Sequence, residues 1–271
     1  MVLESILNPK KAEDRPWYVL ILSILFSFIA IFLSYKLFPS QASILAVAFV
    51  SMLFIPFFQR LFLLEERKDN IESIKKKKDN IFVRHRQLIT VYGAFFVGMI
   101  ITFSIVFVFY PAVQSSLFSL QIDWFRAQGV TGNSIADTSF ERYFMNNSQV
   151  MLIAFAFSML FGAGSVFILS WNASVIAVYL GLVVNKFSAT MGITSAYLYG
   201  VPIGVSAILL HGIPEITAYF FAAIAGGVLS VGLLREEWMS KPFKEVVKDA
   251  LIFLIAAEFL IVIAAFLEAY V

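Results

Sequence analysis

The sequence is short of the residues that most catalytic and metal sites require. It contains no cysteine, which excludes disulfide bonds, thiolate metal sites and cysteine catalysis. With two histidines in the chain, zinc hydrolysis would have to rest almost entirely on carboxylates. The Walker loop and the HExxH and GxSxG motifs are also missing from the sequence. We therefore expect no enzyme, no catalytic residues, no metal, no cofactor and no nucleic acid partner.

Charge is scarce as well. Charged residues make up 14% of the chain, against roughly 25% in soluble proteins. Hydrophobic residues make up 60%, with 30 phenylalanines, which is more apolar surface than one aqueous core would hold but ordinary where side chains face lipid. The sequence predicts an all-α, polytopic integral membrane protein of the cell membrane, with the lipid bilayer as its first partner.

The predicted membrane crossings are clear at both ends of the chain and less regular between them. Apolar segments that can cross a bilayer run through residues 17–37, 42–58, 88–109, 150–171 and 250–270. Between 173 and 234, the run 175–184 has only ten apolar residues, against roughly 20 per crossing. Further on, Gly212 and Pro214 disfavour an unbroken helix. We predict about six crossings, with broken or re-entrant helices around residues 172–215.

Lysine and arginine predict the orientation. Residues 60–86 hold nine of the twenty, whereas residues 111–149 hold only Arg126 and Arg142. Since positive charge is retained on the cytoplasmic side, we expect a cytoplasmic N-terminus and an external C-terminus. The predicted units are an N-terminal transmembrane hairpin (1–59), a cytoplasmic basic amphipathic helix (60–89) and a membrane core (90–271) with an external loop at 111–149.

The basic segment (60–89) and the external segment (111–149) each have apolar residues spaced to lie on one face of a helix. In the basic segment, the apolar or packing positions at helical spacing are Leu64, Ile71, Ile74, Ile81, His85 and Leu88. Two interpretations of this helix stay open. It packs on a neighbouring helix or on a second copy of the chain, or its Lys75–Lys78 run binds anionic lipid headgroups or a protein partner. In the external segment the stripe is Val113, Leu117, Leu120 and Trp124. That pattern indicates an amphipathic helix at the outer surface, acting as an interfacial anchor or as a cap over an opening.

Ionisable residues at membrane depth are the candidate functional positions. His211 and Glu215 lie four residues apart within an apolar stretch, and each such group costs roughly 2.5–3.5 kcal/mol or more. Three interpretations stay open: a structural polar network, a path for a substrate, ion or proton, and a metal site.

Glu258 is a second candidate, near the middle of the last predicted crossing. We expect it to be hydrogen-bonded across a helix interface. Its possible partners are His211, Lys186 and Asn172.

Small residues predict close helix packing. Gly162 and Gly164 flank one alanine, and Gly226 and Gly227 follow Ala222 and Ala223. Because small residues let membrane helices approach closely, these glycines are expected at helix interfaces, including those of a homo-oligomer.

These residues together resemble a known family. The pair Asn146-Asn147, the Gly162-Ala-Gly164 run, Asn172, the segment His211 to Glu215 and the run Ala222 to Gly227 resemble the stage II sporulation protein M family, over roughly residues 90–271. Residues 3–11, followed by a hairpin, resemble its archaeal branch. In sporulating bacteria the family member is similar to a membrane scaffold that holds peptidoglycan-degrading partners and is not itself a hydrolase. For this chain the resemblance implies less, namely a multispan protein with a polar core at Asn147, Asn172, His211 and Glu215. It implies no role for Glu258.

The sequence thus leads to two hypotheses for function. The first is a non-enzymatic membrane scaffold or complex-forming protein, a homo-oligomer with an unidentified protein partner, around a buried His/Glu core. The alternative is a transporter or channel for an ion, lipid or small solute that uses the His211/Glu215 site.

Overall fold

The computed structural model describes residues 8–74, 80–127 and 139–270, and the side chains of all of these except 66–74. Every described element is a helix. The helices are α2 (Pro9–Asp14), α3 (Pro16–Leu37), α4 (Ala42–Ile74), α5 (Ile81–Arg84), α6 (Arg86–Phe109), α7 (Gln114–Leu117), α8 (Ser119–Ala127), α9 (Phe140–Phe161), α10 (Ser165–Ser188), α11 (Ile193–Arg235) and α12 (Lys241–Tyr270), with 3-10 turns at Pro39–Gln41 and Pro111–Val113.

Seven helices in the described ranges are long and apolar enough to cross a membrane: α3, α4, α6, α9, α10, α11 and α12. The all-α, polytopic class is therefore confirmed. The predicted count was about six crossings, and seven described helices qualify as candidates by length and composition.

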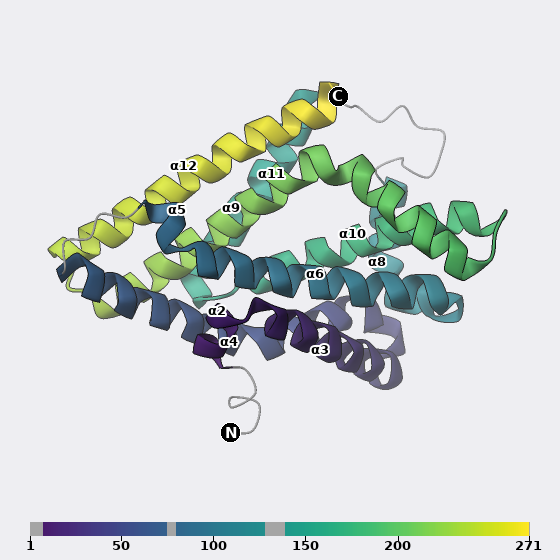
Figure 1. The fold of residues 1–271 in the computed structure, drawn as a ribbon, viewed down its shortest axis with the longest axis horizontal. Coiled ribbons are helices and arrows are strands. Elements are labelled where there is room, and N and C mark those ends of the chain that lie inside the picture. The colour runs from purple at the N-terminus through teal and green to yellow at the C-terminus, as the bar shows by residue number, and fades with distance from the viewer. Residues whose placement is uncertain (1–7, 75–79, 128–138, 271) are drawn as a thin grey trace.

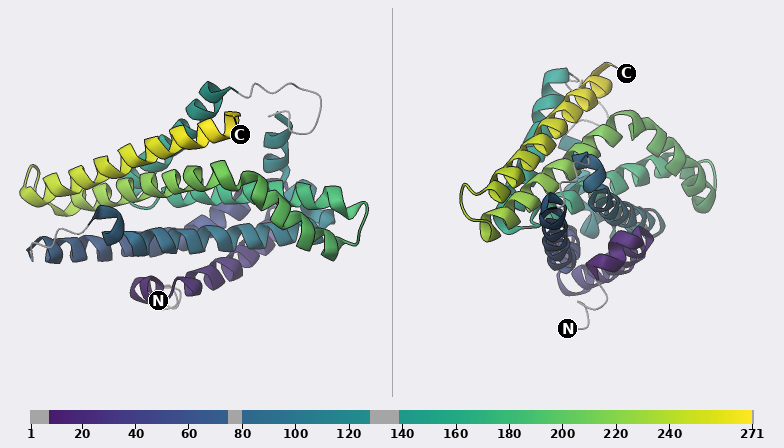
Figure 2. Two further views of the ribbon diagram at one scale, coloured as in Figure 1. Left: turned by 45° about the horizontal axis from the view of Figure 1, so that its top comes forward. Right: turned by 60° about the vertical axis from the view of Figure 1, so that its left-hand side comes forward.

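The helices form two groups that pack side by side. Helices α3, α4 and α6 pack on one another, while α9, α11 and α12 form the other group. Helix α10 lies between the groups and contacts α6 as well as α11. Figure 1 and Figure 2 show α3 and α12 on opposite sides of this bundle.

Aromatic stacking fills the first group. The Phe58 ring stacks on Tyr92 with centroids 4.2 Å apart, and Phe54 lies 4.6 Å from Phe95. All four rings are fully buried. Because lipid offers apolar side chains the same environment as a protein core, such close packing is what holds membrane helices together.

The fourth crossing ends earlier than predicted. Helix α9 stops at Phe161, and Gly162 has a φ of +72°, in the left-handed region that favours glycine. Helix α10 then begins at Ser165 and runs through Asn172. Asn172 does not interrupt it, because its Nδ2 donates to the carbonyl of Ile168, one turn earlier, at 2.8 Å. Within the region 172–215, where broken or re-entrant helices were predicted, the helix break comes between Ser188 and Ile193 and not at Asn172.

The predicted break around residue 212 is also wrong. Helix α11 is continuous over 43 residues, with Pro202 and Pro214 inside it. A proline removes one backbone hydrogen bond and clashes with the carbonyl four residues earlier, but packed neighbours tolerate this in membrane helices. The result is a bent helix, visible in Figure 1.

The predicted basic helix is not a single element. Helix α4 extends the second crossing to Ile74, and a separate turn, α5, precedes α6. The continuous stripe predicted from Leu64 to Leu88 is therefore wrong. Lys75–Lys78, the proposed headgroup site, lie outside the described residues.

The predicted outer helix packs into the bundle. Its buried side chains include Leu117, Gln121 and Phe125, whereas Leu120 and Trp124 are partly exposed. Gln121 holds it in place, because its Oε1 accepts from Ser43 at 2.7 Å and its Nε2 donates to Ser174 at 2.9 Å. Of the predicted stripe, Leu117 is buried in the protein, while Leu120 and Trp124 lie on the exposed side of α8.

Candidate functional site

Four of the five predicted polar residues line one cavity, here called the polar cavity, of about 430 Å³. They are Asn147 from α9, Asn172 from α10, and His211 and Glu215 from α11. The remaining lining residues are Trp124, Phe125, Arg142, Tyr143, Asn146, Val150, Ile153, Ile168, Trp171, Val175, Ile176, Tyr179, Ile208, Gly212, Ile216, Tyr219 and Glu268. A mostly apolar wall with a few convergent polar groups is typical of a small-molecule site.

Helix α11 presents both His211 and Glu215 to this space. The two residues lie one helical turn apart, so they share a face of the helix. Glu215 Oε1 accepts a hydrogen bond from the hydroxyl of Tyr219, a further turn along, at 2.8 Å. Tyr219 is 1% exposed and therefore holds the carboxyl group in a fixed position at the cavity wall.

Glu268, near the end of α12, brings a second carboxyl group to the polar cavity. It interacts electrostatically with Glu215. Sequence reasoning did not select Glu268, because it lies close to the end of a predicted crossing. Its importance comes from the packing of α12 against α11, which places the two glutamates in the same space.

Asn147 has an unusual environment. Its side-chain oxygen accepts from Asn146 Nδ2 at 3.0 Å. Its own Nδ2 is buried and has no hydrogen-bond partner among the described residues, although the residue is only 4% exposed. A buried polar group without a partner costs roughly 1–3 kcal/mol. The Nδ2 atom is itself buried, so it lies behind the wall of the polar cavity.

Glu258, the fifth predicted residue, does not line the polar cavity. Its Oε1 accepts from the hydroxyl of Ser148 on α9 at 3.0 Å. The predicted hydrogen bond across a helix interface is therefore present, but the proposed partners His211, Lys186 and Asn172 were the wrong ones.

The glycines pack helices within the chain. A Cβ at Gly226 would lie 2.7 Å from Ser158 Cβ and meet the carbonyl of Phe155 on α9, and one at Gly227 would meet the ring of Phe62 on α4. Gly164 similarly faces the carbonyl of Phe157 across the turn between α9 and α10. Gly162 makes that turn, and a Cβ there would lie 3.3 Å from Gln59 Cγ on α4.

A second polar region, here called the paired cluster, lies around the start of α6. His85 Nδ1 is 3.3 Å from Glu65 Oε2, and the two side chains are 0% and 2% exposed. Arg84 pairs with Asp249 of α12. The packing role expected for His85 is thus correct, but the sequence did not reveal its ionic partner.

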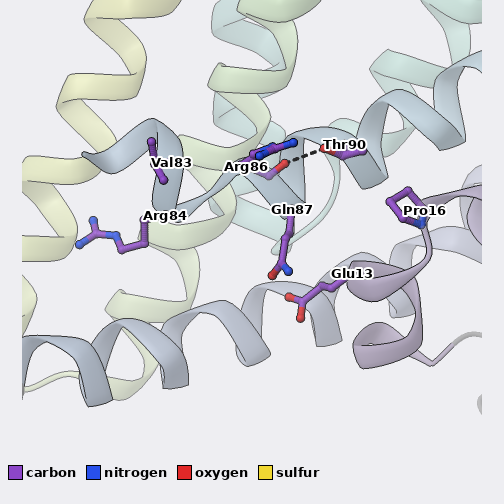
Figure 3. Close-up of a pocket in the computed structure, with 7 residues that line it drawn as sticks. All are labelled: Glu13, Pro16, Val83, Arg84, Arg86, Gln87 and Thr90. Atoms are coloured by element: carbon purple, nitrogen blue, oxygen red, sulfur yellow. Dashed lines mark hydrogen bonds between the residues drawn. The ribbon is translucent and has the colours of Figure 1, made fainter. Parts of the chain in front are cut away.

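A cavity of about 480 Å³ lies beside the paired cluster, between α2–α3 and α5–α6. Figure 3 shows the side chain of Gln87 pointing toward Glu13, and the hydroxyl of Thr90 donating to the carbonyl of Arg86 at 2.9 Å. Arg84 points away from these residues (Figure 3).

The side chains in the polar cavity do not form a metal site. Within the described ranges, no group of three or more histidine, aspartate or glutamate side chains could hold a metal ion. Of the three interpretations of His211 and Glu215, the metal site therefore has no support from the geometry.

Comparison with known proteins places most of the chain in one family. The sequence model of the family described as Stage II sporulation protein M matches residues 88–271. No curated protein and no solved structure matches the chain. The matched region begins within α6 and includes every helix that lines the polar cavity, namely α8, α9, α10, α11 and α12. The α3–α4 hairpin precedes it.

Proposed function

The chain belongs to the stage II sporulation protein M family, and we propose that this multi-pass membrane protein binds a small polar solute in the polar cavity and carries it across the membrane. The single observation that supports this function is the convergence of Asn147, Asn172, His211 and Glu215 on one space. Four polar residues from three helices would be costly at membrane depth unless they pair with one another or serve a ligand.

Transport accounts for the cavity better than a scaffold does. A scaffold needs outward surfaces for its partners, whereas Gly226 and Gly227 are used inside the chain. Helix α8 adds Trp124 and Phe125 to the wall of the cavity, so it covers the site as a lid or gate would.

A scaffold remains a second proposal, because family membership is compatible with it. In that case the unidentified protein partner and the homo-oligomer would use other surfaces, and His211 and Glu215 would serve stability alone. We propose no enzymatic activity for either function. Assignment to the archaeal branch rests on residues 3–11 and also stays a proposal.

The test is a flux assay on purified protein in sealed vesicles, with a panel of labelled small solutes. The double substitution His211→Gln, Glu215→Gln is expected to abolish the flux of the solute that wild type carries while the protein stays folded. Glu258→Gln is the matched control, since it makes the same chemical change outside the polar cavity. If wild type moves none of the solutes, or the double variant moves them as fast, the transport proposal is wrong.

A further inference from the structure

The cavity of about 480 Å³ beside the paired cluster lies at the depth of the lipid headgroups, and we call it the interface cavity. Pro16, the first residue of α3, and Arg86, the first residue of α6, both line it. Both helices are long and apolar enough to cross a membrane, so their first residues mark one end of the hydrocarbon layer. A cavity at this depth borders lipid headgroups and water.

The interface cavity lies above a close contact between α3 and α6. A Cβ at Gly98 would lie 2.7 Å from Ser23 Cβ, and Ser23 Oγ donates to the carbonyl of Phe95 at 2.7 Å. Thr90 lies eight residues before Gly98, which is about 12 Å closer to the start of α6. At that level the two helices leave room for a molecule between Pro16 and Thr90.

The exposed charges around the interface cavity are mainly positive. Arg86 lines it, is exposed, and has no ion-pair partner among the described residues. Arg84 adds no free charge, because it pairs with Asp249. The segment 10–15 forms part of the wall and exposes three cations and one anion, namely Lys10, Lys11, Arg15 and Asp14.

Glu13 is the acidic residue in the lining, but it belongs to the packing of the protein. It is 8% exposed and already has an interaction partner, and the side chain of Gln87 points toward it (Figure 3). The exposed ionic group that a ligand meets is therefore the guanidinium of Arg86. A guanidinium favours phosphate, because its planar N–H donors match two phosphate oxygens.

Below the interface cavity, α6 presents an apolar surface. Gly93 and Val97 follow Arg86 and Thr90 at helical spacing, so the four residues share one face of the helix. A Cβ at Gly93 would meet no atom of the described residues within 4 Å, and Val97 is 45% exposed. The missing side chain at Gly93 leaves a depression on this face. A cation at headgroup depth above an apolar depression matches a phospholipid better than a free phosphate ion.

From these features we propose that the interface cavity binds an anionic phospholipid, with its phosphate on Arg86 and an acyl chain along Gly93 and Val97. Basic pockets between membrane helices bind such headgroups. Net negative charge matters, because a phosphatidylcholine headgroup carries a positive group beside its phosphate. This site shares no lining residue with the polar cavity, so it does not depend on the proposed function. It also differs from the Lys75–Lys78 run, which lies outside the described residues.

The experiment is native mass spectrometry of the full chain released from nanodiscs with equal amounts of phosphatidylglycerol and phosphatidylcholine. Wild type should retain phosphatidylglycerol in preference, and Arg86→Gln should reduce this retention at least about fivefold. Lys248→Gln is the matched control. It removes one exposed cation at the same end of the bundle, beside Asp249 and outside the interface cavity, and should leave retention unchanged.

Thr90→Phe tests the space itself without a change of charge. Its ring would occupy the interface cavity and should reduce phosphatidylglycerol retention as strongly as Arg86→Gln does. Melting temperatures check that each variant is folded, and if Thr90→Phe is not, the comparison of Arg86→Gln with Lys248→Gln still decides the point. Equal losses in those two variants, or equal retention of both lipids by wild type, would overturn the proposal, because overall charge would then explain the binding.

Competition separates the lipid from a soluble phosphate. An excess of inorganic phosphate or glycerol 3-phosphate should leave the retained phosphatidylglycerol unchanged, because neither carries an acyl chain to lie on α6. Displacement by either compound would overturn the lipid as the ligand. None of these results depends on solute flux, so the vesicle assay decides the proposed function separately.

Discussion

The polar cavity and the paired cluster both bury ionisable side chains in an apolar bundle, yet they satisfy them differently. In the paired cluster each ionisable group faces a partner: His85 Nδ1 lies 3.3 Å from Glu65 Oε2, and Arg84 pairs with Asp249. In the polar cavity, Glu215 and Glu268 both line an open space, and the buried Nδ2 of Asn147 has no hydrogen-bond partner among the described residues. Ionisable groups that pair with each other, as in the paired cluster, can be explained by stability alone. Polar groups that line an open space, as in the polar cavity, are better explained by the binding of a ligand.

The comparison also separates two uses of histidine. His85 is fully buried against Phe253, with ring centroids 5.3 Å apart, and links α6 to the end of α4. His211 is only partly buried and borders the polar cavity. From the sequence, His211 was selected because of its neighbour Glu215, while the partner of His85 lies twenty residues away and gave no local signal.

The largest effect on stability is expected in the paired cluster. His85→Leu leaves Glu65 buried without this ionic partner, so the free energy of unfolding should fall by about 3–5 kcal/mol. Denaturant titration of the purified protein in lipid–detergent micelles measures this. The control is the double variant Glu65→Leu, His85→Leu, which removes both charges and should recover much of the loss. Equal losses in the two variants would show that the pairing does not matter.

The next largest effect is expected at the α9–α11 contact. Gly226→Ala places a Cβ against the backbone of Phe155, and forcing these helices apart should cost about 1–3 kcal/mol. Gly212→Ala, in the same helix, meets only Ile208 Cβ at 3.9 Å, and should be neutral or slightly stabilising. Melting temperatures of the two variants test this, and similar destabilisation in both would contradict the packing argument.

A smaller loss is expected at the bond between α9 and α12. Ser148→Ala removes the hydroxyl that donates to Glu258, and a hydrogen bond to a carboxyl group contributes roughly 1–3 kcal/mol. Ser116→Ala, which removes a hydroxyl bonded to the carbonyl of Pro39 at an exposed position, is the control with the smaller cost. If Ser148→Ala leaves the melting temperature unchanged, Glu258 does not depend on this bond.

The smallest effect on stability, with the largest on function, is expected in the polar cavity. In Glu215→Gln the amide oxygen still accepts from Tyr219, so unfolding should change by less than about 1 kcal/mol. Solute binding should fall at least about tenfold, because the negative charge is lost. Measuring both properties on one preparation tests the contrast with His85. A loss of several kcal/mol in Glu215→Gln would instead place this carboxyl group in a structural network.

The sequence alone determined the membrane class, the places of most crossings and four of the residues around the polar cavity. Hydropathy depends on the transfer of each segment from water to lipid, which is a local property, and a costly ionisable group stands out within an apolar run. The turn at Gly162 and the continuity of α10 and α11 were missed. The turn and the two continuous helices depend on hydrogen bonding and packing within the folded chain. A helix continues through a proline or an asparagine only where neighbouring helices or backbone carbonyls supply the missing contacts.

Only the tertiary structure decided which polar groups share a space. Glu268 joins Glu215 because α12 packs on α11, while Glu258, on the same helix, bonds to Ser148 instead. Asn147 becomes significant because packing buries its amide and leaves one donor unused. Such relations join residues far apart in the chain, and no local pattern of hydropathy or spacing encodes them.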